Sequence, residues 1–184
     1  SQRGYKVVAV SDSSGAIYHA DGLDVAAAKE DKKQHGKLSK SQQGKAMSGD
    51  DLLTLEVDVL VLAALENQLH RDNVGEVKAG AVLEIANGPL TSDADAALEK
   101  RVVPVLPDVL ANTGGVIVSY FEWVQNKQAL RWNGDKVNAR LEEYLLRAYS
   151  NVENASSQHS TSLRHGAFIL AVKRVLEASK LRWM

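Results

Sequence analysis

Four short apolar runs punctuate the first 106 residues of the chain. They are Lys6–Ser11, Asp58–Ala64, Ala81–Ala86 and Arg101–Leu106, and their β-branched residues predict strands. The second run shows no alternation, which is typical of a strand buried on both faces in a parallel sheet. Pro104 cannot donate to a ladder and places the fourth run at an edge or a strand end. The pattern predicts an open α/β sheet of about four strands.

Helical patterns separate these runs. Asp24 is expected to cap a helix over Val25–Lys33 that ends at Gly36. Ser92 is expected to cap a second helix over Asp93–Lys100, whose acids lie in its first turn, as the helix dipole favours.

The composition between the first helix and the second run predicts a solvated loop over Gly36–Gly49. Between Lys29 and Lys45, six Lys face only Glu30 and Asp31, a local charge of +4. This stretch is either an ordinary solvated surface or an attraction for an anionic ligand or partner.

No strand pattern follows residue 115. Val116–Leu130 predicts a helix, Asn151–Ser162 a polar segment, and Leu163–Ser179 a further, largely apolar helix. Between them, six apolar positions recur with helical spacing and predict one buried stripe: Val137, Leu141, Tyr144, Leu145, Ala148 and Val152. Strand–helix alternation followed by a helical tail indicates the α/β class.

Composition narrows the classes of function. The 184 residues include no Cys, which excludes disulfides, thiolate zinc sites, iron–sulfur clusters and a Cys nucleophile. A net charge of −1 argues against a dedicated nucleic-acid binder. The five His lack metal-ligand spacing, so we expect no metal site. No apolar run approaches the roughly 18–20 residues that span a bilayer, so we expect no membrane role and a cytoplasmic location.

A first polar cluster follows the first predicted strand. Asp12 and Ser13 stand where the second strand of a dinucleotide-binding fold presents an acid to the adenosine ribose. Asp and Ser at strand ends are also common turn residues, so a plain turn is the alternative.

A second cluster follows the third run, at Asn87-Gly88-Pro89. Gly admits positive φ and Pro fixes φ, so a tight turn is expected here. The Asn87 amide either faces a ligand at the carboxyl end of the sheet or closes an Asx turn.

A third cluster spans Pro107–Asn126. Its polar loop ends at Gly114-Gly115 and starts a helix, where paired glycines permit close approach and free N–H groups favour an anion. Ser119, about one turn in, is placed to donate to the same anion. The alternative is a plain loop-to-helix junction.

Taken in order, these clusters resemble the C-terminal dinucleotide-binding domain of glutamate dehydrogenases. The resemblance covers nearly the whole chain and rests on these segments: Lys6–Asp12, Gly15–Tyr18, Ala63–Gln68, Glu84–Pro89 and Pro107–Asn126. Related leucine, valine and phenylalanine dehydrogenases share Asn-x-Gly-Gly-Val but are not similar across Ser119–Trp123. The resemblance therefore favours glutamate.

This resemblance implies NAD- or NADP-linked oxidative deamination of L-glutamate to 2-oxoglutarate and ammonia, and a homo-oligomer, a hexamer in this family. Asp12 and Ser13 would hold the adenosine ribose, and Ala63 and Ala64 would line the adenosine side of the cleft. In the other half, Asn87 would contact the nicotinamide half of the cofactor and Asn112 its carboxamide. The remaining two roles concern substrate, with Val116 and Ser119 meeting glutamate, Ser119 through its side-chain carboxylate.

Several features depart from the family pattern. Leu62 replaces a Pro, and Ile85 replaces a Gly beside the expected cofactor cleft, where a β-branched side chain narrows the space. The sequence contains no GxGxxG turn, and no residue is predicted to be catalytic.

From these departures we expect a Rossmann-like sheet that lacks its usual first strand. Residues 1–128 are expected to form an incomplete dinucleotide-binding domain, and residues 129–184 a helical tail. We expect an N-terminally truncated fragment that is inactive alone. Exposed sheet edges and apolar surface are expected to cause poor solubility or self-association. A non-catalytic binding or regulatory subunit, or a dehydrogenase of another amino acid, are the alternatives.

Overall fold

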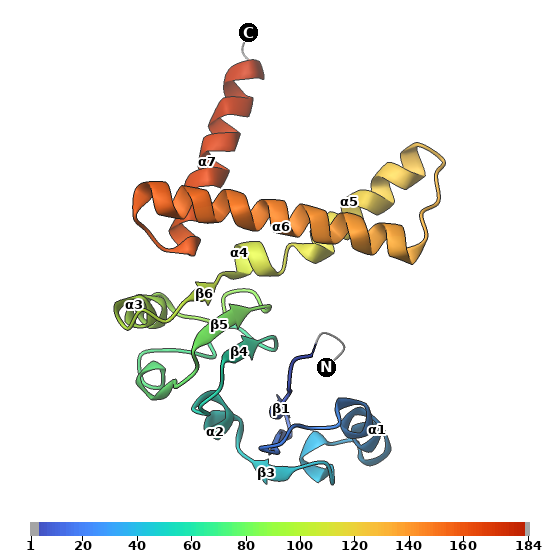
Figure 1. The fold of residues 1–184 in the computed structure, drawn as a ribbon, viewed down its shortest axis with the longest axis vertical. Helices are drawn as coiled ribbons and strands as arrows, with labels where there is room; N and C mark the ends of the chain where they lie inside the picture. Colours follow the sequence, from blue (N-terminus) through green and yellow to red (C-terminus); the bar gives the residue numbers. More distant parts are fainter. Residues whose placement is uncertain (1–3, 183–184) are drawn as a thin grey trace. The chain divides into compact units, whose positions relative to one another are not determined.

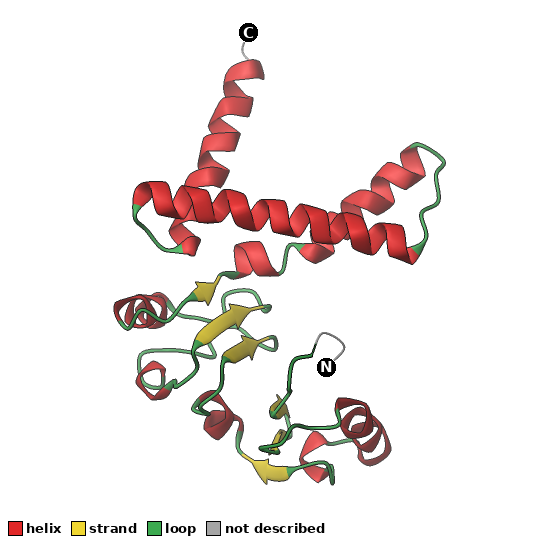
Figure 2. Cartoon of the chain, in the orientation of Figure 1, coloured by secondary structure: helices red, strands yellow, loops and turns green. Residues whose placement is uncertain are grey.

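The chain, described over residues 4–182 by a computed structural model, folds into two compact units. Unit 1 holds the residues up to Asp58 together with Gly75–Ala79, and unit 2 holds Val59–Val74 and the chain from Gly80 onward. Figure 1 labels the elements of both units, and Figure 2 shows that helices dominate the C-terminal part. The predicted α/β class, with open sheets and a helical C-terminal end, is confirmed.

Unit 1 contains a small antiparallel sheet. Strand β1 (Ala9–Asp12) pairs with β2 (Gly15–Tyr18), and β2 pairs with β3 (Lys45–Met47). The core of the unit is formed by Ile17, Ala28 and Leu38, with Val10 and Leu23 packed against it.

The expectation of one four-stranded sheet is wrong, because the first strand joins this antiparallel sheet instead of the parallel one. A tight turn explains the difference. Gly15 has φ of +126°, and the Asp12 carboxylate accepts the Ser14 N–H at 2.7 Å, so the chain reverses directly after β1. The following Gly15–Tyr18 then pairs back along β1.

Helix α1 (Val25–His35) follows the hairpin as predicted. The Asp24 side chain accepts the Ala27 N–H, and Gly36 ends the helix in a left-handed conformation. The solvated loop predicted over residues 36–49 is wrong in part, since it contains the 3₁₀ turn η1 (Leu38–Lys40) and β3. Leu38 is only 6% exposed because η1 turns it into the core of unit 1.

A short helix, α2 (Gly49–Leu53), follows β3 in unit 1. Ser48 and Asp51 form a reciprocal capping box at its start. The sequence analysis did not predict this helix.

Unit 2 contains a parallel sheet in the order β4–β5–β6. Its strands are β4 (Val59–Leu62), β5 (Ala81–Glu84) and β6 (Val105–Leu106), and the 3₁₀ turn η2 (Val74–Glu76) precedes β5. The predicted parallel arrangement of these three runs is confirmed. The prediction that β4 is buried on both faces is wrong: Leu60 and Leu62 are buried, whereas Val59 and Val61 are 47% and 48% exposed.

The fourth run forms a shorter strand than predicted. Helix α3 (Ser92–Lys100) is extended by a C-terminal turn in which the Val103 N–H bonds to the Leu98 carbonyl and Val102 has positive φ. Only Val105–Leu106 then pairs, at the end of the described sheet, as Pro104 predicts. The cap of α3 is Thr91 and not Ser92, because the Thr91 hydroxyl accepts the Ala94 N–H.

Four helices complete unit 2: α4 (Asp108–Ala111), α5 (Gly114–Lys127), α6 (Gly134–His159) and α7 (Leu163–Arg182). Helix α5 begins two residues before the predicted start. Helix α6 continues through most of the polar segment at residues 151–162, because Val152 on its apolar stripe packs with Leu110 and Ala167. None of the six stripe positions is exposed, which confirms the predicted amphipathic face.

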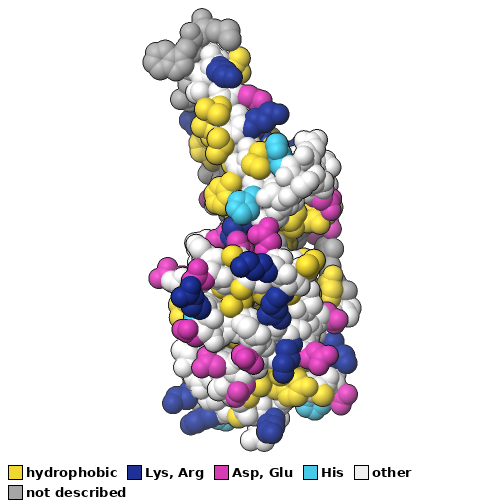
Figure 3. Space-filling view, turned by 90° about the vertical axis from the view of Figure 1, so that its left-hand side faces the viewer, with side chains coloured by type: hydrophobic (Ala, Val, Ile, Leu, Met, Phe, Trp, Pro, Cys, Tyr) yellow, Lys and Arg dark blue, Asp and Glu magenta, His cyan; other side chains and the backbone are white. Residues whose placement is uncertain are grey.

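Helix α7 carries several apolar side chains that are exposed to solvent. Figure 3 shows hydrophobic side chains along one side of this helix, and the exposed apolar residues there include Phe168, Val172, Val175 and Leu176. Within the described chain, no helix is both long enough and apolar enough to cross a membrane.

Helices α6 and α7 approach closely at Gly166. A Cβ at this position would lie 2.8 Å from the backbone nitrogen of Ser156 and 3.0 Å from its Cα. Atoms cannot approach this closely without displacement of the backbone, so the crossing depends on a residue without a side chain.

Gly166→Ala is therefore expected to lower the free energy of unfolding by about 1–3 kcal/mol through overpacking. Urea denaturation followed by circular dichroism measures this change. Gly134→Ala, at the open start of α6, is the matched control and is expected to be neutral or slightly stabilising. Equal stability of the two variants would contradict the prediction.

Candidate functional site

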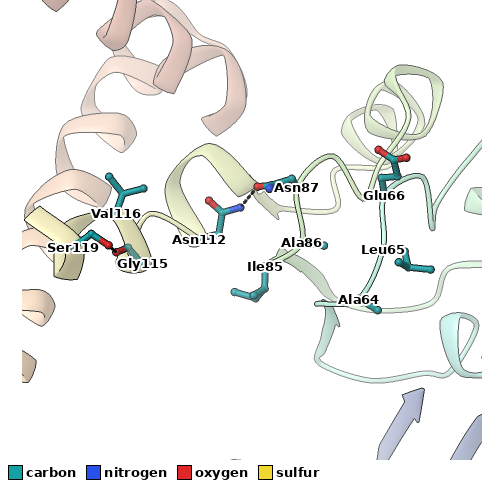
Figure 4. A pocket seen from close by; sticks show the side chains of 10 residues that line it. All are labelled: Ala64, Leu65, Glu66, Ile85, Ala86, Asn87, Asn112, Gly115, Val116 and Ser119. Carbon is teal, nitrogen blue, oxygen red and sulfur yellow. Dashed lines mark hydrogen bonds between the residues drawn. The ribbon is translucent and has the colours of Figure 1, made fainter. Parts of the chain in front are cut away.

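An open cavity of about 840 Å³ lies within unit 2, at the carboxyl ends of β4 and β5 (Figure 4). Parallel strands end at the same edge of a sheet, so the loops that follow them converge there. Three segments line the cavity: residues 64–66 after β4, residues 85–87 after β5, and the junction of α4 with α5 (Asn112, Gly115, Val116 and Ser119). The size lies within the range of pockets that take small ligands.

Two asparagines face each other on the rim of this cavity. The Asn112 side-chain amide donates from Nδ2 to Oδ1 of Asn87 at 2.6 Å (Figure 4). Gly88 holds the turn after Asn87 with φ of +55°, and its carbonyl accepts the Asn67 N–H. This backbone bond helps to hold the turn that carries Asn87.

The start of α5 forms the opposite part of the lining. The first N–H groups of an α-helix have no partner within the helix, and the Thr113 side chain does not cap those of α5. A Cβ at Gly115 would meet no atom within 4 Å, which leaves the backbone open to close approach. The Ser119 hydroxyl donates to the Gly115 carbonyl at 3.0 Å. The partial positive charge of this helix end favours an anionic group.

A partly buried ionic cluster lies behind the rim. Arg164, near the start of α7, donates from Nη2 to Glu84 at 2.7 Å, from Nε to Asp95 at 2.9 Å and from Nη1 to Asp108 at 3.4 Å. Glu84 is fully buried, and its second oxygen accepts the Asp108 backbone N–H at 2.7 Å. Asp108 in turn accepts the Gly88 N–H at 2.8 Å.

Electrostatics in this cluster favour the charged form of the arginine. Burial opposes the charge of the guanidinium, but the hydrogen bonds from it to Glu84 and Asp95 raise the pKa of Arg164 above its ordinary value. One cation thus faces three carboxylates.

The structure brings five of the eight sequence-predicted residues to one cavity: Ala64, Asn87, Asn112, Val116 and Ser119. Ala63 directly precedes the lining and is itself not part of it. The roles of these residues stay predictions.

Asp12 and Ser13 belong to unit 1. The Asp12 carboxylate accepts the Ser14 N–H and hydroxyl, which agrees with a turn, and forms a 2.8 Å ion pair with Lys32. Partial burial acts to raise the pKa of Asp12, but the bonds from Lys32 and Ser14 outweigh it and lower the pKa to about 2. Asp12 therefore carries a fixed negative charge at neutral pH.

The sequence analysis missed the ionic cluster behind the cavity. The one signal for it was Glu84, an acidic residue at the end of an apolar run, since a buried carboxylate requires a partner.

Over residues 4–182, no group of three or more His, Asp or Glu is arranged to hold a metal ion.

Comparisons of sequence and of structure with known proteins match this chain to one family of dehydrogenases. The family model described as Glutamate/Leucine/Phenylalanine/Valine dehydrogenase matches residues 1–182. The chain is 46% identical to the glutamate dehydrogenase of Thermotoga maritima over 179 residues and 48% identical to the NADP-specific glutamate dehydrogenase of Halobacterium salinarum over 180. Each alignment covers 97% of this chain and 43% of the relative, so the chain spans less than half the length of these proteins.

The fold has the same neighbours. The hetero-hexameric glutamate dehydrogenase of Thermus thermophilus, in its leucine-bound form, superposes with a TM-score of 0.92 at 36% identity. This match covers 98% of the chain and 42% of that structure.

The Asp12–Lys32 pair predicts a pH dependence in unit 1. Lys32→Ala is expected to raise the pKa of Asp12 from about 2 toward its ordinary value of 3.8. A carboxyl group whose pKa is lowered on folding stabilises the protein at every pH above its pKa in the unfolded state. This stabilisation disappears as the pH falls from about 4 to about 2. Carboxyl-carbon NMR titration measures the pKa; the exposed Lys33→Ala is the control, and an unchanged Asp12 pKa in Lys32→Ala would contradict the assignment.

Proposed function

Because the chain belongs to the glutamate/leucine/phenylalanine/valine dehydrogenase family, we propose that it is the nucleotide-binding part of an NAD(P)-dependent glutamate dehydrogenase. The predicted family is thereby confirmed. The proposed reaction is the oxidation of L-glutamate by NAD⁺ or NADP⁺ with water, which gives 2-oxoglutarate, ammonium, NAD(P)H and a proton. In our division of the chain, residues 1–128 bind nucleotide and residues 129–184 form the helical tail.

The observation that carries this proposal is the pair of asparagine amides on the rim of the cavity. In their mutual bond, Asn112 uses one Nδ2 hydrogen and Asn87 uses Oδ1. Within the described chain, no other bond occupies the Asn87 amino group or the Asn112 Oδ1 atom. The pair thus keeps one free donor, on Asn87, and one free acceptor, on Asn112, and a primary carboxamide such as that of nicotinamide can bond to groups of either kind.

The start of α5 is suited to the acidic substrate. The uncapped N–H groups and the Ser119 hydroxyl lie at the positive end of a helix, where a carboxylate is stabilised. Rotation of the Ser119 hydroxyl away from the Gly115 carbonyl would let it donate to the side-chain carboxylate of glutamate. Val116, exposed beside it, would contact the aliphatic part of the substrate.

We propose NAD or NADP as the cofactor. The negative charge of Asp12 opposes a 2′-phosphate and accepts a ribose hydroxyl, while Lys32 beside it reduces that repulsion. One of the relatives is NADP-specific, which supports NADP as a cofactor.

Chemistry beyond binding requires further groups. Among the residues that line the cavity, Glu66 is the one with an ionisable side chain. We expect the 184-residue chain by itself not to convert glutamate, and we expect the complete enzyme to be a homo-oligomer. Formation of NAD(P)H by the purified 184-residue chain with glutamate would contradict the first expectation, and a monomer of the complete protein in light scattering would contradict the second.

The substrate assignment is tested in the full-length protein that contains this chain, by following NAD(P)H absorbance with glutamate, leucine and phenylalanine. Glutamate is expected to be the preferred substrate, and Ser119→Ala is expected to raise the KM for glutamate about tenfold, the effect of losing about 1.4 kcal/mol from a hydrogen bond to a charged group. Ser150→Ala, at an exposed position of α6, is the control and should leave KM unchanged. Preference for leucine or phenylalanine would support a different amino-acid dehydrogenase, and absence of all turnover would support a non-catalytic subunit.

A further inference from the structure

Arg164 connects the C-terminal helix to both segments that carry the asparagine pair. Its partners Glu84 and Asp108 lie 80 and 56 residues away along the chain. Glu84 is the last residue of β5, three positions before Asn87, and Asp108 is the first residue of α4, which Asn112 ends. The two carboxylates thus stand at the bases of the two segments that reach the rim.

Hydrogen bonds donated by backbone N–H groups link these two bases to each other and to the rim. The Asp108 N–H donates to Glu84, and the Gly88 N–H donates to Asp108, so the loop after β5 and the start of α4 are joined twice. The Asn112 N–H donates to the Asp108 carbonyl across the single turn of α4. The separation of Asn87 from Asn112 is therefore set by the placement of Asp108 and Glu84.

The charges of the cluster make the arginine necessary for that placement. Glu84 has no exposed surface, and Asp95 and Asp108 present two further negative charges to the same guanidinium. Without a cation the carboxylates repel one another, and the buried Glu84 loses its charged partner. A planar guanidinium presents five donors in a fixed fork, whereas an ammonium group is a compact charge with three donors on a flexible stem.

We propose that Arg164 is a positioning residue for the Asn87–Asn112 pair and acts through Glu84 and Asp108. The C-terminal helix α7 thereby determines the geometry of the cavity rim. The identity of the group that the rim receives, a carboxamide of the nicotinamide type, rests on the proposed function, whereas the positioning itself does not.

The direct test is Arg164→Gln in the 184-residue chain without ligand. NMR is expected to show a shift of the Asn112 side-chain amide resonances, and hydrogen exchange of the Asp108 and Gly88 amides is expected to accelerate at least about tenfold. Arg174→Gln, at an exposed position of the same helix, is the matched control and should change neither. A folded Arg164→Gln protein with unchanged Asn112 signals and exchange rates would overturn the proposal.

Two further variants separate positioning from a general loss of structure. Arg164→Lys keeps the charge next to Glu84 but not the planar fork, so it is expected to stay folded and to show intermediate exchange at Asp108 and Gly88. If Arg164→Gln does not fold, wild-type exchange in Arg164→Lys would overturn the proposal. Asp95→Asn removes a partner that does not lead to the rim and should leave the Asn112 resonances in place; a shift as large as that of Arg164→Gln would also overturn it.

A kinetic measurement in the full-length protein tests the link to function. Arg164→Lys is expected to raise the KM for NAD(P) severalfold with a smaller change in the KM for glutamate, because the rim and not the start of α5 is displaced. Loss of this selectivity, with intact NMR effects, would refute the carboxamide assignment and leave the positioning role standing. Unchanged NMR signals would refute the positioning role whatever the substrate of the enzyme.

Discussion

Compensation of the buried Glu84 charge is the constraint on which the arrangement of unit 2 depends. A carboxylate without exposed surface is tolerated when a cation and hydrogen-bond donors replace the lost water. Arg164 and the Asp108 N–H supply these, and they come from α7 and from the start of α4. The sheet, the short helix and the C-terminal helix therefore stabilise one another through this one carboxylate.

Features encoded by neighbouring residues were predicted correctly. The parallel runs at Val59–Leu62 and Ala81–Glu84, the helix between Asp24 and Gly36, and the apolar stripe of α6 each follow from local periodicity or capping. The grouping of Asn87, Asn112 and Ser119 around one cavity follows from the rule that loops after parallel strands meet at one edge.

Features that depend on residues far apart in the sequence were not predicted. Strand β3 has no apolar alternation of its own and exists through its pairing with β2. The exposure of Val59 and Val61 depends on what covers the sheet, which a run of β-branched residues does not encode. The Arg164 cluster joins residues up to 80 positions apart, and a single sequence offers no signal for such pairing beyond the isolated acid at Glu84.

The division of the chain into interleaved units has a consequence for the order of folding. Unit 1 includes Gly75–Ala79, which follow β4, so neither unit is a continuous stretch of sequence. During synthesis from the N-terminus, the hairpin and α1 leave the ribosome before the last part of their own unit has been made. Unit 1 therefore completes its native contacts only after the first strand of the parallel sheet has emerged, and proteolysis at one peptide bond between Val59 and Val74 would sever both units.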